Sequence, residues 1–224
     1  MIDADPFAAH VVFRVGPVAV GRVVVTTWMI MAALSLGLGL ATRRMPAQPG
    51  RVQAVLEMLV EGICAQIEET MQVPPRPYLP LLGTLFLFVL VANLSPMLPG
   101  VQAPTARLET TAALALVVFI AGHALGIRTR GLKRYLQHYL EPNPLLLPLT
   151  LLSEITRTFA LMVRLFGNIM SHELVIAVVL GLAGLLVPVP IMALGLLIGA
   201  VQAYIFAILA AVFLGAAVGA VEAG

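Results

Sequence analysis

The residues most able to do chemistry lie together in one segment, residues 153–174, with the sequence SEITRTFALMVRLFGNIMSHEL. Most of its side chains are apolar, but six ionisable or amide side chains stand among them: Glu154, Arg157, Arg164, Asn168, His172 and Glu173. Histidine and carboxylate side chains bind and release protons or cations, and a guanidinium keeps its positive charge. Charged groups within a membrane are costly and usually line a polar path, so this segment is a candidate ion path.

The spacing of these residues predicts a polar stripe along one helix. Arg157, Arg164, Asn168 and His172 are seven, four and four residues apart, so a helix places them on one face, with Glu173 beside its end. No acidic residue lies three or four positions from Arg164. A guanidinium at bilayer depth needs a carboxylate from elsewhere in this chain or from another chain. For the other ionisable groups, above all Arg157, mutual salt bridges inside a helical bundle remain the alternative.

The composition shows which kind of protein positions this segment. Apolar residues make up 60% of the 224 positions and charged residues 11%, whereas soluble domains have about 45–50% and about 25%. The chain is therefore an integral membrane protein. Its formal net charge of +2 gives no support for a nucleic-acid partner. The single Cys64 excludes an internal disulfide and a metal site built from cysteines.

The hydropathy pattern predicts a single all-α membrane domain with about five membrane helices and one interfacial amphipathic helix. We expect an external amino-terminal segment, a first span, the interfacial helix, a helical hairpin and a pair of long helices at residues 1–22, 23–42, 51–72, 78–127 and 145–220. The amphipathic helix lies on the membrane or against a partner; a surface-packed helix without a further role is the simpler interpretation.

The two long helices are the most unusual prediction. Each has roughly 35–40 residues, so a straight helix would reach about 55–60 Å, nearly twice the hydrocarbon thickness. Such helices must tilt strongly, bend or break, and a turn at Gly167 and Asn168 is the alternative. We expect a multi-pass protein of the cell inner membrane. Basic residues follow the first span and the hairpin, which predicts an external amino terminus and a cytoplasmic carboxyl terminus.

Four motifs in one order carry a family resemblance. RLFGN at residues 164–168 is followed by Glu173, and the last helix contains VQAYIFAIL at residues 201–209. ANLSPMLPG at residues 92–100 and PTARLETTAALAL at residues 104–116 lie in the hairpin. Over residues 78–210 this pattern resembles subunit a of F-type ATP synthases. The resemblance implies long, strongly tilted helices in place of a turn at Gly167.

The resemblance also implies a mechanism. In the family, a ring of small proteolipid subunits, each with one membrane-embedded carboxylate, turns against subunit a. Arg164 would separate two half-channels that do not meet, and Gln202 would bond or position its guanidinium. Glu173, His172 and Asn168 would line an ion path. The candidate residues with an accessory role are Arg157, Glu109 and Tyr204.

The partners that the resemblance implies are the c-ring proteolipids, the b subunits of a peripheral stalk and the lipid bilayer. The chain has no phosphate-binding glycine loop, so we expect no bound nucleotide, no cofactor, no metal and no covalent catalysis by the chain itself. The coupled ion is H+ or Na+, and RTFAL at residues 157–161 is similar to a sodium-associated branch. A secondary transporter or a structural subunit of another membrane complex is the alternative function.

Two of the departures from the family pattern concern the candidate ion path. Many relatives have a small residue at the position of His172 and a histidine near the position of Gly195, so the two positions are expected to face each other. The hairpin has Arg107 and Glu109 where relatives often have aspartate and asparagine, which changes the charge at the channel entrance.

Overall fold

The computed structural model describes residues 11–15, 18–43, 51–98, 101–133, 135, 147–184 and 187–219. Along these parts of the chain the elements are β1 (Val11–Val15), β2 (Val18–Gly21), α1 (Arg22–Arg43), α2 (Arg51–Met71), α3 (Leu79–Leu94), η1 (Ser95–Met97), η2 (Pro104–Ala106), α4 (Leu108–Arg130), α6 (Leu147–Ala183) and α7 (Pro188–Val218). Residues 1–10, 16 and 17 of the predicted external segment lie outside the described residues. So do residues 99 and 100 of the predicted hairpin and residues 145, 146, 185, 186 and 220 of the predicted long pair.

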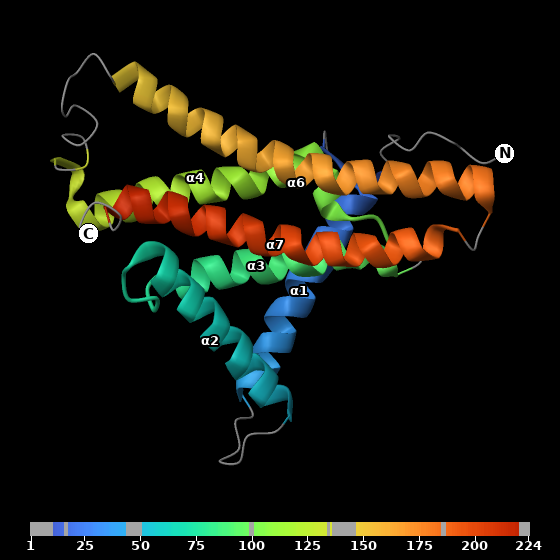
Figure 1. Ribbon diagram of the computed structural model, residues 1–224, viewed down its shortest axis with the longest axis horizontal. Coiled ribbons are helices and arrows are strands. Elements are labelled where there is room, and N and C mark those ends of the chain that lie inside the picture. The colour runs from blue at the N-terminus through green and yellow to red at the C-terminus, as the bar shows by residue number, and fades with distance from the viewer. Residues whose placement is uncertain are drawn as a thin grey trace.

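Five described helices, α1, α3, α4, α6 and α7, are long and apolar enough to cross a membrane. This number confirms the prediction of about five spans. Figure 1 shows α3, α4, α6 and α7 side by side along the long axis of the molecule, with α1 and α2 directed away from them. The amphipathic α2 contacts α7 and α3, so at least part of its apolar stripe is used for packing within the chain.

The strands β1 and β2 form an antiparallel hairpin in which Val15 pairs with Val18 and Arg14 with Ala19. The sequence analysis did not predict this hairpin. Valine is frequent in both strands, and β-branched residues favour extended backbone. Two short strands give a weak signal beside the long apolar helices, which is why the hairpin was missed.

The helix α6 is continuous over 37 residues, without a turn at Gly167, and Figure 1 shows it as one unbroken helix. At 1.5 Å per residue it is about 55 Å long. It ends where Gly184 takes a φ of 74°, a left-handed conformation that glycine adopts without strain. The 31 residues of α7 follow, with Pro188 at its start. The prediction of two long helices is confirmed.

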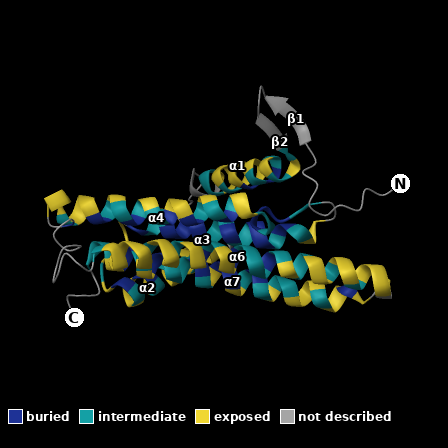
Figure 2. Ribbon diagram, turned by 90° about the horizontal axis from the view of Figure 1, so that it is seen from above, coloured by how far each residue is buried: buried dark blue, intermediate teal, exposed yellow. Residues whose placement is uncertain are grey.

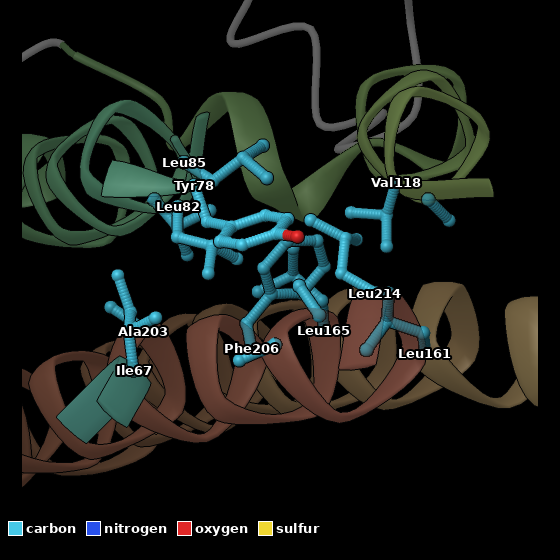
Figure 3. Close-up of a cluster of buried hydrophobic side chains, with 14 of the residues drawn as sticks. Ile67, Tyr78, Leu82, Leu85, Val118, Leu161, Leu165, Ala203, Phe206 and Leu214 are labelled. Carbon is cyan, nitrogen blue, oxygen red and sulfur yellow. The ribbon is translucent and has the colours of Figure 1, made fainter. Parts of the chain in front are cut away.

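The core lies where α3, α4, α6 and α7 meet (Figure 3), and Phe206 and Leu214 of α7 are fully buried in it. The buried face of α7 is otherwise rich in small residues, namely Gly199, Ala203, Ala210, Ala211 and Gly215. Small residues let helix backbones approach closely, which is how helices associate where water does not drive burial. Close packing of this kind fixes the rotation of α7 against its neighbours.

The helix α6 contributes much less to the core. Only 11% of its span is buried, against 33% of the α7 span, and Figure 2 shows exposed residues along most of its length. Leu161, Leu165 and Ile169 form the buried edge. One long face of α6 is therefore available to lipid or to a partner subunit.

Candidate functional site

Arg164 lies near the middle of α6, seventeen residues after Leu147 and nineteen before Ala183. Leu161 and Leu165 on the adjacent face are buried, so packing fixes the rotation of the helix here and leaves Arg164 exposed. Within the part of the chain that the structure describes, its guanidinium has no hydrogen-bond or ion-pair partner. This geometry holds a permanent positive charge on the outer surface of the bundle, halfway along the longest helix.

Gln202 of α7 contacts the polar stripe of α6 at Asn168, which lies one helical turn after Arg164. The side-chain amide of Asn168 donates to Oε1 of Gln202 over 3.1 Å, and Gln202 is only 4% exposed. The resemblance implied that Gln202 bonds or positions the guanidinium. In the structure it is bonded instead to the neighbour of Arg164 on the stripe, so it fixes α7 against α6 at this level.

His172 lies one turn further along α6 and faces α7. Its imidazole occupies the space that a side chain at Gly195 would need. This contact confirms that positions 172 and 195 face each other. A glycine at position 195 leaves the room that the imidazole of His172 needs between the two long helices.

Glu173 lies beside the loop that joins the hairpin helices. Its Oε1 accepts a hydrogen bond of 3.3 Å from the backbone N–H of Ala103. The carboxylate lines a cavity of about 330 Å³ whose wall also includes Gln102, Arg107 and Glu109. The structure thus brings Glu173 together with both hairpin charges that depart from the family pattern.

Asn93 is a positioning residue that entered the sequence-based prediction only as part of the motif ANLSPMLPG. Its amide donates to the carbonyl of Gly199 over 2.9 Å, and its carbonyl accepts from the hydroxyl of Thr105 over 2.7 Å. Both Asn93 and Thr105 are buried. These bonds hold α3, η2 and α7 together close to Gln202. An amide side chain within a span that has no charged residue was the sequence feature from which Asn93 could have been identified.

A second polar cavity, of about 380 Å³, lies between α4, α6 and α7, and its lining includes Glu154, Arg157 and Thr158 of α6. His123 of α4 also lines it, with Nε2 at 3.4 Å from Oε2 of Glu154. The contact between His123 and Glu154 was not predicted from the sequence. The Thr158 hydroxyl donates to the backbone carbonyl of Glu154.

The remaining predicted site residue, Tyr204, lies elsewhere. Its hydroxyl donates to Oε1 of Gln66 on α2 over 2.7 Å, and the residue is 47% exposed. It lines neither of the two polar cavities. The described residues also contain no group of three or more His, Cys, Asp or Glu side chains that could hold a metal ion.

The fold and these residues define a multi-pass membrane protein with ionisable side chains along its longest helix. The family described as ATP synthase A chain matches residues 24–215. ATP synthase subunit a 2 of a Bradyrhizobium species is 56% identical over 223 residues, which cover 100% of both chains. ATP synthase subunit a 2 of Pelobacter propionicus is 49% identical and covers 94% of this chain and 92% of its own. The protein named ATP synthase subunit a 1 in Hahella chejuensis is 47% identical, over 95% of this chain and 91% of its own. The chain therefore belongs to the family of ATP synthase A chains.

Proposed function

We propose that Arg164 separates two ion half-channels in this chain, which by its family is the ion-translocating stator subunit of an F-type ATP synthase. The observation that carries the proposal is the position of the two polar cavities. One is lined by α6 residues from Leu149 to Thr158 and the other by α6 residues from Phe166 to Ala177, with no lining residue in common. Arg164 lies between them along the helix and lines neither.

The spacing along α6 requires a carrier between the cavities. Glu154 is ten residues before Arg164 and Glu173 is nine residues after it, so each carboxylate is about 14–15 Å from it along the helix axis. An ion that enters one cavity cannot step directly to the other through this chain. A moving carboxylate on a partner, loaded at one cavity and unloaded at the other, would complete the path.

The chemistry of arginine suits the position between the cavities. Its guanidinium stays charged at any accessible pH, whereas a buried lysine can lose its proton. It repels a cation that would otherwise leak between the half-channels and attracts the carboxylate that passes it. The partner is a ring of c-type proteolipids, each with one such carboxylate, and the exposed face of α6 is where the ring docks.

The basic residues support an orientation in the membrane. Arg128 and Lys133 lie at or beyond the end of α4, the end near the cavity lined by Glu154, and basic residues next to spans favour the cytoplasmic side. The cavity lined by Glu173 and the hairpin loop then opens outside. This gives an external amino terminus and a cytoplasmic carboxyl terminus in the cell inner membrane. The 224 residues act as one membrane domain.

Other subunits of the complex have the remaining functions. The b subunits of a peripheral stalk would hold the chain still while the ring turns, and ATP is made or hydrolysed on other subunits. The interfacial placement of α2 belongs to the same proposal. The outer entrance would be lined by Glu109, and the cytoplasmic half-channel by Arg157, as accessory residues.

The test is ATP-driven ion uptake into vesicles that carry the assembled complex, with H+ and Na+ tracers read in parallel. Arg164→Gln should abolish coupled uptake while the complex remains assembled. Arg76→Gln is the matched control, because Arg76 is exposed in the loop between α2 and α3, and it should behave as wild type. The tracer taken up by the wild type identifies the ion. Undiminished uptake by Arg164→Gln would overturn the proposal.

A further inference from the structure

His123 and Glu154 form an ionisable pair between two helices in the cavity of about 380 Å³. Nε2 of His123 on α4 is 3.4 Å from Oε2 of Glu154 on α6, and the side chains are 31% and 28% exposed. Both groups are therefore shielded from bulk solvent on most sides but still reach the cavity.

The second ring nitrogen determines the tautomer of His123. Nδ1 of His123 is 2.9 Å from the backbone carbonyl oxygen of Phe119. A carbonyl oxygen accepts hydrogen bonds and cannot donate, so Nδ1 has the hydrogen, as a donor. In a neutral imidazole with that tautomer, Nε2 has only a lone pair, and this lone pair would face an ionised carboxylate. Two acceptors at this distance repel each other, and a proton on either Nε2 or the carboxyl group removes that repulsion.

Two aromatic rings and one guanidinium lie near the pair. The ring of Phe119 lies 4.2 Å from the imidazole between centroids, and the ring of Tyr135 lies 6.0 Å away, edge-on. The other titratable groups that line the cavity are Arg157 and Tyr135, while α7 lines it with Phe213, Ala216 and Ala217. The charge of Arg157 opposes a second positive charge on His123 and stabilises an ionised Glu154.

We propose that the His123–Glu154 pair is a proton-holding station in the half-channel on the α4 carboxyl-terminal side of the bundle. The pair takes one proton from the cytoplasmic solution, holds it on Nε2 or on the carboxyl group, and releases one proton toward the ring carboxylate. Its charge is restored after each transfer. This proposal rests on the proposed function, because it makes this cavity a route for protons between the cytoplasm and the ring.

The experiment is ATP-driven proton uptake by the assembled complex in inverted vesicles, whose outer medium is on the cytoplasmic side. The rate is measured against the pH of that medium for Glu154→Gln, His123→Gln and the exchanged pair His123→Glu with Glu154→His. The single variants should lower the rate on the order of tenfold or more, as loss of a positioned acid or base does. They should also shift the pH profile, and the exchanged pair should restore both.

The control is Thr129→Val, whose hydroxyl bonds only within α4, and it should keep the wild-type rate and profile. ATP hydrolysis and retention of the ring show that each variant assembles. A wild-type pH profile in both single variants would overturn the proposal, whether or not their rates fall. Uptake that survives in Arg164→Gln would overturn the proposed function instead, so the two failures are distinguishable.

Discussion

The imidazole of His172 on α6 lies where a side chain at Gly195 of α7 would begin. One polar side chain fits between the long helices at this level, on the side of Arg164 that leads to Glu173. The contact explains how relatives can have the histidine on the other helix. The space is shared by two positions, and the residue at one of them must be small.

Gly195→Ala is therefore expected to destabilise the contact between α6 and α7. The new methyl group overlaps the imidazole of His172, and overpacking of this kind costs about 1–3 kcal/mol. Thermal unfolding of the purified complex should show a lower transition for Gly195→Ala. The double variant with His172→Ala should recover most of the loss, because it empties the space; a further loss in the double variant would contradict this explanation.

The bonds of Asn93 give a second prediction. Asn93→Leu removes the two hydrogen bonds to Thr105 and Gly199, at a cost of about 1 kcal/mol for each bond. The thermal stability of the complex should fall accordingly. Thr84→Val is the matched control, because its hydroxyl bonds only to carbonyls of the preceding turn and the change should be within about 0.5 kcal/mol.

The Tyr204→Phe variant tests whether the hydroxyl of Tyr204 contributes to helix packing or to ion transport. The variant loses the hydrogen bond to Gln66, so we expect about 0.5–1.5 kcal/mol less stability with coupled ion uptake close to wild type. The measurement is uptake per assembled complex beside thermal unfolding. A severe loss of uptake at normal assembly would place Tyr204 on the ion path, contrary to its position between α7 and α2.

Glu173→Gln should slow coupled uptake on the order of tenfold or more, because it removes the carboxylate next to the hairpin loop. Glu109→Gln lies in the same cavity but is exposed, so its effect should be smaller. The comparison is made at saturating ATP in vesicles with equal amounts of complex. Equal effects of the two substitutions would show that the cavity contributes only its overall charge.

Water access to each cavity can be tested with the one native thiol removed as Cys64→Ser. Cysteines at Gln102 or Ala177 should react with a membrane-impermeant thiol reagent from the outer side, because both line the cavity next to Glu173. Cysteines at Thr150 or Ser153, which line the other cavity, should react from the cytoplasmic side. Reaction of either set from both sides would mean that the cavities are continuous.

Sequence periodicity was sufficient to predict the features that depend on a single helix. The five spans, the two long helices and the polar stripe from Arg157 to His172 follow from local spacing and hydropathy. It was also predictable that His172 and Gly195 face each other. The sequence resembles a family in which many members have the histidine near the second of these positions and a small residue at the first.

Contacts between helices were not predictable in the same way. The pairing of His123 with Glu154 and that of Asn168 with Gln202 depend on the rotation of each helix about its axis. That rotation is set by packing at Leu161, Leu165 and Phe206, across elements far apart in the sequence. A lone histidine in an apolar helix gives no indication of its partner, so His123 was overlooked.

The most direct test of the central claim is the passive leak of cations through the membrane sector without ATP. If Arg164 is the barrier between the two cavities, the wild type should hold an imposed ion gradient, and Arg164→Gln should let it decay faster, with Arg76→Gln as the tight control. An unchanged leak in Arg164→Gln, with coupled uptake intact, would contradict the account and leave Arg164 with a structural role.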